Sequence, residues 1–206
     1  MSRSDENITS PSRAEERRWI HRAQEGHHEA FEKLVRRYTR NVYGLSLALC
    51  GDPEDAEEVA QEAMVKAFRK IRTYGFKAPF CSWLLSITRN AFKDFVRKKG
   101  QQRRKHEAFK EQARNPAPQD PEELAHRKSR IRSVHDALGR VPEPFREAVH
   151  LYDIQGLSYV EIASVCGVSL GTVKSRISRG RVALREVLVA AGVVGPGAKK
   201  REPEES

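Results

Sequence analysis

The side chains with the clearest chemistry in this chain are cations that recur at helical spacing. One set runs from Arg89 to Lys105, where eight lysines and arginines accompany a single acid, Asp94. A second set lies at 172–181. Ammonium and guanidinium groups pair with phosphates, and arginine also bonds to base edges. The two sets therefore indicate contacts with nucleic acid at two separate places.

The second set belongs to a helix-turn-helix pattern. Ser158 and Glu161 have the Ser-x-x-Glu spacing of a capping box, which begins a helix. Gly167 suits the tight turn after that helix because glycine adopts a positive φ without strain. A small residue, a glycine and an aliphatic anchor at this spacing are typical of the motif. Its structural positions are Ser158, Ala163, Gly167 and Val173.

The second helix of this motif has an apolar and a polar face. Val173, Ile177 and Leu184 are predicted to point inward. The polar face carries groups that bond to guanine edges or to phosphates, and the pattern does not separate these two kinds of contact. The predicted contacts with duplex DNA are Thr172, Lys174, Ser175, Arg176 and Arg179.

An aromatic-bearing loop precedes the first set of cations. Gly75 and Pro79 interrupt the helical pattern between Arg72 and Phe80, and a new helix is predicted from about Cys81 to Lys98. Cations follow phosphates and aromatic rings hold unstacked bases, which is what capture of a single strand requires. The candidate single-strand contacts are Phe76, Lys77, Arg89, Asn90, Lys93 and Arg97.

The aromatic residues near this loop have a second interpretation. Phe80 and Trp83 fall on the apolar stripe of the following helix, and we assign both to the core rather than to base stacking. For Phe76 the core and the base contact both stay open.

Two helical segments must position these side chains. Apolar residues recur at helical spacing over 13–98 and again over 129–190. The intervening 99–128 is strongly charged, contains several prolines and lacks an apolar face, so it is predicted to be a flexible linker. The ends, 1–12 and 191–206, read as disordered. The predicted fold is all-α, with two small helical domains on a tether.

An acidic helix face stands out against the net charge of +10. Asp52 can cap the helix that follows Gly51, and Pro53 fits its first turn. The apolar face of this helix includes Phe68. The opposite face carries Asp55, Glu58, Gln61, Glu62 and Val65. Two interpretations remain open here: an ordinary solvated face, or a docking face for a basic protein partner.

Composition narrows the class of protein. The chain has 206 residues, of which 38% are hydrophobic and 32% charged. Its positive charge favours a polyanionic partner. Three widely spaced cysteines predict neither a disulfide framework nor a zinc site, and they fit a reducing cytoplasm. The chain has no run of about eighteen apolar residues, so we expect no membrane insertion. We find no phosphate-binding glycine loop and no nucleophile–base pair, and we expect no catalytic residue, metal or cofactor.

Three segments, in this order, resemble the sigma-70 family, and most closely its small extracytoplasmic-function group. They are 52–62, 80–90, and the pair 156–163 and 171–181. The resemblance implies a sigma-2-like helical bundle over 13–98 and a sigma-4-like helix-turn-helix domain over 129–190. Such a protein binds core RNA polymerase, through its β′ and β subunits, and directs it to specific promoters.

The resemblance also implies a role for each surface. The acidic face would dock on the clamp helices of the β′ subunit, and the linker would cross the polymerase toward the RNA exit path. The candidate single-strand contacts would read and melt the minus-ten element, and the helix-turn-helix would hold the minus-thirty-five element as duplex. An anti-sigma factor is the expected repressing partner.

Two other functions are weighed against this one. A stand-alone helix-turn-helix regulator would bind a palindrome as a dimer, but it leaves the acidic face and the first cationic helix unexplained. A DNA-processing enzyme, such as a recombinase or a nuclease accessory, would need a catalytic serine, tyrosine or carboxylate cluster, and we find none in the sequence.

Overall fold

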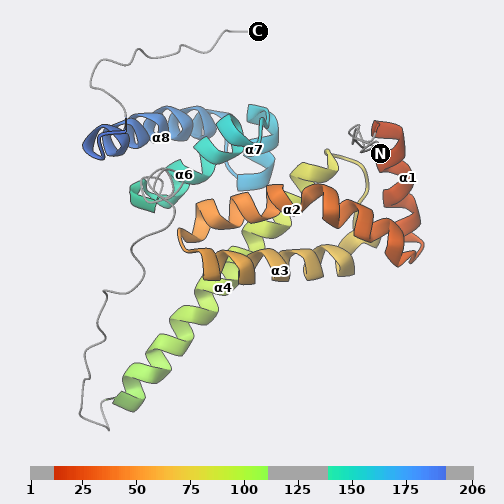
Figure 1. The fold of residues 1–206 in the computed structure, drawn as a ribbon, viewed down its shortest axis with the longest axis horizontal. Coiled ribbons are helices and arrows are strands. Elements are labelled where there is room, and N and C mark those ends of the chain that lie inside the picture. Colours follow the sequence, from red (N-terminus) through yellow and green to blue (C-terminus); the bar gives the residue numbers. More distant parts are fainter. Residues whose placement is uncertain (1–11, 111–138, 194–206) are drawn as a thin grey trace, which may run out of the picture.

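The computed structural model describes residues 12–110 and 139–193, and all regular structure in these ranges is helical. The N-terminal domain comprises α1 (Arg13–Gln24), α2 (His28–Cys50), α3 (Pro53–Lys70), the short η1 (Ile71–Thr73) and α4 (Phe80–Lys110). The C-terminal domain comprises α6 (Glu143–Val149), the π-helical η2 (His150–Ile154), α7 (Tyr159–Cys166) and α8 (Leu170–Ala190). Figure 1 shows the second domain packed near one end of α2, with α1 at the other end. The all-α prediction is confirmed for these residues.

The three long helices of the N-terminal domain enclose its core. Gly51 ends α2 in the left-handed conformation, with φ 72°. Asp52 then caps α3, because its Oδ1 accepts hydrogen bonds from the amides of Glu54 and Asp55 at 3.0 Å each. Small residues on α3 allow both α2 and α4 to pack closely against α3. The fully buried alanines of this face are Ala56, Ala63 and Ala67.

The C-terminal domain contains the predicted helix-turn-helix. Ser158 is the N-cap of α7, and the Glu161 carboxylate bonds back to the Ser158 amide at 2.9 Å, so the capping box is complete. Gly167 makes the turn with φ 67°, and Ser169 caps α8. Val173 is fully buried beneath the motif. This geometry fixes the direction in which α8 presents its polar face.

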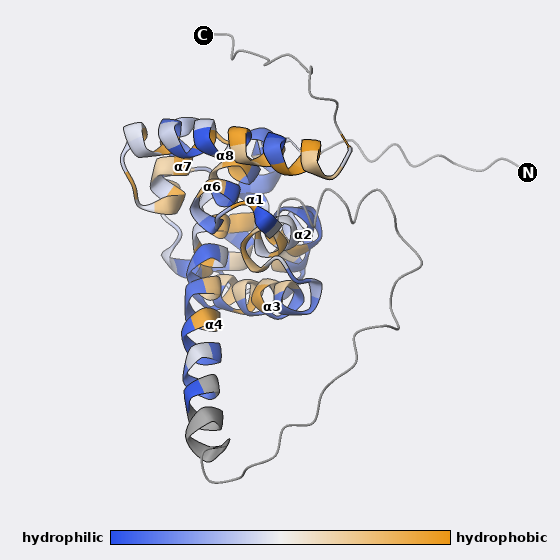
Figure 2. Cartoon of the chain, turned by 90° about the vertical axis from the view of Figure 1, so that its left-hand side faces the viewer, coloured by the Kyte–Doolittle hydropathy of each residue, from blue (hydrophilic) through white to orange (hydrophobic). Residues whose placement is uncertain are grey.

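α4 is longer than the predicted helix, which was expected to end at Lys98. It continues to Lys110 and contains 31 residues, which corresponds to roughly 46 Å at about 1.5 Å per residue. The additional segment is rich in glutamine, arginine and lysine, which are good helix formers, and Gly100 alone does not stop it. Figures 1 and 2 show α4 running away from the body of the protein. The rest of the predicted linker and most of both ends lie outside the described residues.

The two domains share one apolar cluster, which the expectation of two tethered domains did not include. Leu45 and Leu49 of α2 and Leu85 of α4 pack with residues of α6, η2, α7 and α8. All three leucines are at most 2% exposed. The C-terminal residues of this cluster include Ala148, Leu151, Leu157, Ile162, Val165, Cys166, Val173 and Ile177. Figure 2 shows these helices seated directly on the N-terminal domain.

The length and hydropathy of the helices can also be compared with those of a membrane span. Among the described residues, no helix combines the length and the hydropathy needed to cross a membrane.

Candidate nucleic-acid and protein interfaces

The polar face of α8 carries the predicted duplex contacts. Lys174, Ser175 and Arg179 are exposed, whereas Thr172 and Arg176 are half-buried. The Thr172 hydroxyl already has one hydrogen-bond partner at the helix cap, since its Oγ1 lies 2.9 Å from Ser169 Oγ. The opposite face of the helix is buried at Val173, Ile177 and Gly180. Lys174, Ser175 and Arg179 therefore lie on the face of α8 away from the core, with Thr172 and Arg176 at its border.

Arg181 differs from the other arginines of α8. Its Nε donates to Asp153 Oδ2 at 3.0 Å, and its guanidinium lies 5.2 Å from the centre of the Tyr152 ring. The hydrogen bond to Asp153 raises the pKa of Arg181. This arginine ties α8 to η2, which leaves the cations at Lys174, Arg176 and Arg179 for an external anion.

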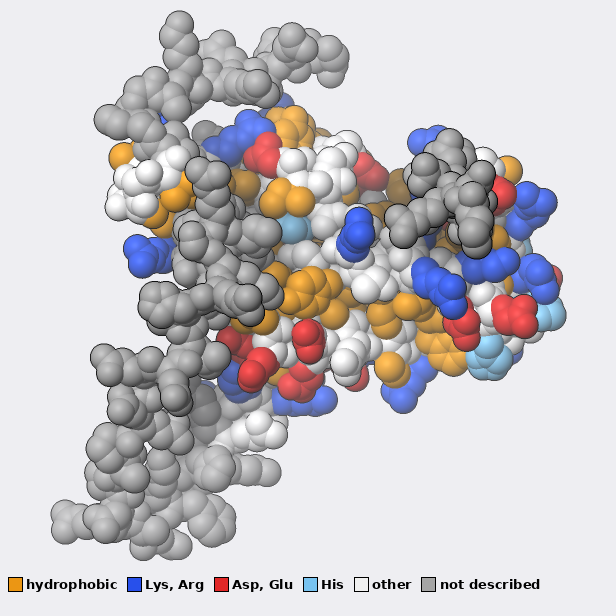
Figure 3. All heavy atoms as spheres, viewed as in Figure 1, with side chains coloured by type: hydrophobic (Ala, Val, Ile, Leu, Met, Phe, Trp, Pro, Cys, Tyr) orange, Lys and Arg blue, Asp and Glu red, His pale blue; other side chains and the backbone are white. Residues whose placement is uncertain are grey.

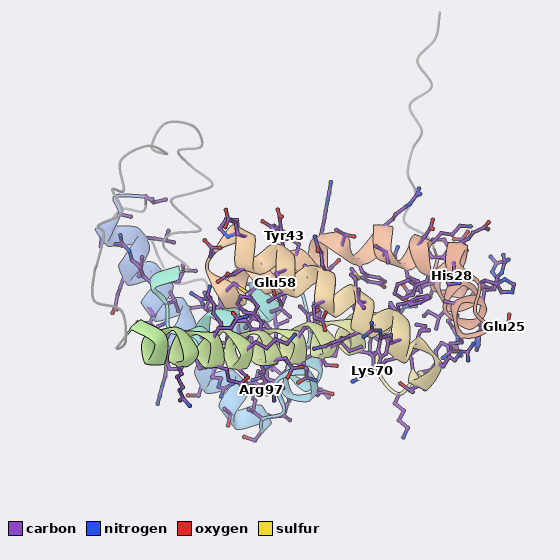
Figure 4. The ribbon with its side chains drawn as sticks, turned by 90° about the horizontal axis from the view of Figure 1, so that it is seen from below. Glu25, His28, Tyr43, Glu58, Lys70 and Arg97 are labelled. Atoms are coloured by element: carbon purple, nitrogen blue, oxygen red, sulfur yellow. The ribbon has the colours of Figure 1, made fainter. Side chains whose placement is uncertain are left out.

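Three of the predicted single-strand contacts lie along the exposed side of α4. Asn90, Lys93 and Arg97 are exposed and spaced three to four residues apart, so they share one face. Arg97 bonds to Asp94 at 2.9 Å, and Asp94 also accepts from Lys66 of α3 at 2.7 Å. Figure 4 shows Arg97 beside α4. A nucleic acid phosphate could approach this face without displacing a buried group.

Arg89 differs from these three residues because it is mostly buried and bonded to the other domain. Its Nε donates to Glu147 Oε1 at 2.6 Å, and its side chain is only 14% exposed. Glu147 belongs to α6 and is completely buried. Burial raises the pKa of Glu147, while the guanidinium of Arg89 acts in the opposite direction. A predicted DNA contact of the first domain is thus bonded to the second domain.

Further polar contacts cross the same boundary. Ser82 Oγ of α4 donates to Glu161 Oε1 at 2.9 Å, so the capping carboxylate of α7 also bonds to the other domain. Arg146 Nη2 donates to the Leu49 carbonyl at 2.8 Å. Leu49 lies in the last turn of α2, where carbonyls lack helical partners and the dipole favours a cation. The domain contact is therefore polar and specific as well as apolar.

The loop before α4 holds the remaining single-strand candidates. Lys77 is exposed and Phe76 is half-buried. Phe76 is the one described non-glycine residue with a positive φ, 56°. Its ring packs 4.8 Å from that of Tyr74, whose hydroxyl closes the loop by donating to the Ala78 carbonyl at 2.7 Å. Phe80 is buried and Trp83 packs against the core, as the apolar stripe predicted.

The acidic face of α3 divides into paired and exposed positions. Lys99 donates to both carboxylate oxygens of Asp55, at 2.8 and 2.6 Å, and Lys66 lies 3.5 Å from Glu62. Glu58 and Gln61 are exposed. Figure 3 shows acidic side chains gathered below the centre of the molecule, and Figure 4 places Glu58 on α3. The exposed pair is the part of this face that is most accessible to a partner.

Apolar side chains adjoin the acidic face. Val65 is 43% exposed and Phe68 is 40% exposed. The prediction that Phe68 belongs to the inward face is therefore wrong in part, because its ring lies at the rim and contacts Phe31 edge-on at 5.1 Å. Sequence periodicity missed this because Phe68 follows Ala67, which is fully buried, and one position is about 100° around a helix.

The described residues were also compared with the requirements of metal binding and thiol chemistry. The described part of the chain holds no group of three or more His, Cys, Asp or Glu side chains arranged for a metal ion. Cys50, Cys81 and Cys166 are unbridged. Burial raises the pKa of the Cys81 thiol to about 11 and that of Cys166 to about 12. These thiols remain protonated at neutral pH in this arrangement.

Comparison with known proteins identifies both domains. Residues 34–102 match sigma-70 region 2, and residues 131–184 match sigma-70 region 4. The chain is 33% identical over 176 residues to the RNA polymerase sigma-H factor of Pseudomonas aeruginosa, covering 82% of this chain and 91% of that protein. It is 41% identical over 161 residues to the ECF RNA polymerase sigma factor SigE of Mycolicibacterium smegmatis. That match covers 77% of this chain but only 62% of the relative, less than two thirds of its length.

Solved structures show the same likeness. The sigma factor RpoE from Bartonella quintana, in complex with the anti-sigma factor NepR, has a TM-score of 0.61 at 26% identity, over 77% of this chain and 96% of that one. CnrH, in complex with the cytosolic domain of CnrY, has a TM-score of 0.63 at 25% identity, over 85% of this chain and 98% of that one.

Proposed function

Since the chain belongs to the sigma-70 family, in its extracytoplasmic-function group, we propose that it binds core RNA polymerase and directs it to specific promoters. The observation that carries this proposal is the order of the two family regions on two helical domains, the second of which contains a capped helix-turn-helix. It would act as an initiation factor in the cytoplasm, without catalytic activity of its own.

The minus-thirty-five element is the proposed ligand of α8. A recognition helix enters the major groove with its N-terminal residues toward the bases. Lys174, Arg176 and Arg179 lie in the first half of α8 and are not engaged as Arg181 is with Asp153. Thr172 and Ser175 add neutral donors and acceptors. This set supports a grip on duplex DNA by both phosphates and base edges.

The minus-ten element is the proposed ligand of α4 and the loop before it. Melting without a nucleotide cofactor requires that captured bases offset the cost of unpairing, about a few kcal/mol for each extruded base. Asn90, Lys93 and Arg97 supply an exposed row for the backbone of the separated strand. Phe76 and Lys77 stand in the loop at the other end of α4, where a base would be held.

Core polymerase is the proposed partner of the acidic face. Glu58 and Gln61 are exposed on α3, and Val65 beside them adds apolar surface. Charge complementarity with a basic helix steers and orients such a complex. Asp55 and Glu62 contribute after exchanging Lys99 and Lys66 for cations of the polymerase. We assign this contact to the β′ subunit of the polymerase. The β subunit is the second subunit that we expect the chain to bind.

Release of the domain contact is part of the proposed cycle. Arg89 is bonded to Glu147 and is 14% exposed, so it reaches DNA only after α6 moves away. The two domains must also separate to follow two promoter elements joined by a spacer, and the tether then sets the effective concentration of the second contact. An anti-sigma factor, like the one bound to RpoE, would hold the chain in an inactive arrangement.

A charge-reversal experiment on polymerase binding tests the core assignment. Glu58→Lys is expected to abolish co-elution with core polymerase on gel filtration, since it sets a cation against a basic partner. Glu25→Lys makes the same change in charge at an exposed position well away from Glu58 and is expected to co-elute normally (Figure 4). If the wild-type chain failed to co-elute with core, the proposal itself would be wrong. If both variants co-eluted, the docking face would lie elsewhere.

A further inference from the structure

α1 is a helix for which neither the family match nor the predicted contacts provide a role. The region 2 match begins at residue 34, ten residues after α1 ends at Gln24. None of the proposed DNA contacts lies on it. Yet α1 is firmly part of the domain, because Ile20 is 1% exposed in the core and Tyr38 of α2 bonds to Glu16 at 2.6 Å.

The C-terminal residue of α1 holds the start of the loop that precedes α4. Gln24 Nε2 donates to the carbonyls of both Ile71 and Tyr74, at 3.0 and 2.8 Å. These two carbonyls bracket the turn that leads from η1 into the loop. One side-chain amide with two donors therefore fixes the path of the backbone, and a side chain without donors would leave both carbonyls unpaired.

Two further residues of α1 hold the tip of the same loop. The ring of His21 is stacked on that of Phe76, with centroids 4.8 Å apart and planes inclined by 30°. The guanidinium of Arg17, one helical turn away, lies 5.0 Å from the Phe76 ring centre. Arg17 and His21 are both exposed, so neither contributes to the hydrophobic core.

Phe76 needs such support because of its backbone. Its φ of 56° lies in the left-handed region, which is unfavourable for a bulky residue and persists only where neighbours over-determine it. The contacts from His21, Arg17 and Tyr74 surround the ring in this way. The loop that we assign to base capture is therefore held in one conformation from outside its own region.

We propose that α1 is a positioning helix for base capture: Gln24 fixes the entry of the loop, His21 and Arg17 fix Phe76, and together they set base preference at the minus-ten element. This inference rests on the proposed sigma function. These residues act through the loop. They are not expected to affect recognition of the minus-thirty-five element, which we assign to the other domain. Loss of one of them weakens the discrimination between bases at the minus-ten element, because a looser loop holds the preferred base less selectively.

Run-off transcription with core polymerase tests this proposal, using promoters randomised separately in the minus-ten and minus-thirty-five elements. His21→Ala and Gln24→Glu are expected to flatten base preference at one or more minus-ten positions by roughly tenfold, about the effect of one contact worth 1.4 kcal/mol. Preference within the minus-thirty-five element should stay as in the wild type. Gln24→Glu keeps size but loses both donors.

Rescue and control variants separate positioning from general damage. His21→Phe retains a ring that can stack on Phe76 and is expected to restore the wild-type preference. Arg22→Ala removes an exposed cation from the same helix and should change nothing. Arg17→Ala provides a variant at an exposed position, where loss of the fold is not expected. Thermal unfolding of each variant establishes that the domain is intact.

Two outcomes would overturn the inference. One is an unchanged minus-ten preference in His21→Ala, Gln24→Glu and Arg17→Ala alike. The other is a uniform fall in transcription with the preference profile intact, which would assign α1 to stability alone. A wild-type chain that yields no promoter-dependent transcripts is a different result, since it contradicts the proposed function rather than the role of α1.

Discussion

Arg89 of α4 and Glu147 of α6 form a buried ion pair between the two domains, with 2.6 Å between Nε and Oε1. The carboxylate is completely buried, and the side chain of Arg89 is 14% exposed. A residue predicted to touch melted DNA is thus occupied by the domain predicted to hold duplex DNA. The arrangement in this structure is closed, and it occupies the side chain that the proposed minus-ten contact requires.

Glu147→Gln is expected to open the closed arrangement. Removing one partner of a buried ion pair leaves the other uncompensated, at a cost of roughly 3–5 kcal/mol, and here the cost falls on the closed form because separation exposes Arg89 to water. Small-angle X-ray scattering should therefore give a larger radius of gyration for the variant. Asp153→Asn breaks the Arg181 pair within the C-terminal domain and is the matched control. Equal radii for Glu147→Gln and the wild type would show that the pair does not hold the domains together.

Reactivity of the Cys166 thiol should report the same opening. Burial raises its pKa to about 12, and Arg89 is one of the few groups acting to lower that pKa. In a background with Cys50→Ser and Cys81→Ser, Arg89→Ala would slow labelling by a thiol reagent if only electrostatics changed, because the thiolate is the nucleophile. We expect faster labelling, since separation of the domains exposes the thiol. A slower rate would mean that the domains stay in contact.

Gly180→Ala is expected to destabilise the C-terminal domain. A Cβ at this position would lie 2.5 Å from Val149 Cγ2 and 2.7 Å from the Phe145 carbonyl oxygen, so α8 could not approach α6 as it does. Overpacking of this kind costs about 1–3 kcal/mol. Denaturant unfolding measures the change. Gly171→Ala, on the same helix with an exposed Cβ position, should be neutral or stabilising, and an equal loss in both variants would exclude the packing explanation.

Arg176→Ala is expected to weaken binding to the minus-thirty-five duplex. A direct contact to a base edge is worth about 1–3 kcal/mol and relaxes specificity at one position, whereas a phosphate contact weakens binding uniformly and lowers the salt dependence. Titration of labelled duplexes at several salt concentrations distinguishes the two. Arg69→Ala, an exposed cation at the end of α3, removes the same charge elsewhere. Unchanged affinity at fixed salt for Arg176→Ala would remove this residue from the interface.

The elements that local sequence governs could be predicted well. The capping box of Ser158 and Glu161, the turn at Gly167 and the cap at Asp52 depend on residues within a few positions, and each is present. The inward face of α8 follows directly from helical periodicity at Val173 and Ile177. The all-α class follows from the same patterns.

The contacts between distant segments could not be predicted in this way. Leu45 and Leu49 follow helical spacing, but periodicity says only that a face is buried and not what covers it. Arg89 has the spacing of a surface cation, and its partner lies 58 residues away. The role of α1 was missed for a related reason, because a stacking contact such as His21 on Phe76 has no signature in sequence spacing.

Run-off transcription with bacterial core polymerase lacking any sigma factor tests the central claim most directly. The purified chain and a library of promoter fragments are added, and the transcripts are sequenced. We expect discrete starts that depend on this protein and share two elements at a fixed spacing upstream, with activity that falls when the spacer length is changed. No protein-dependent starts, together with no co-elution with core, would contradict the assignment and favour a stand-alone helix-turn-helix regulator.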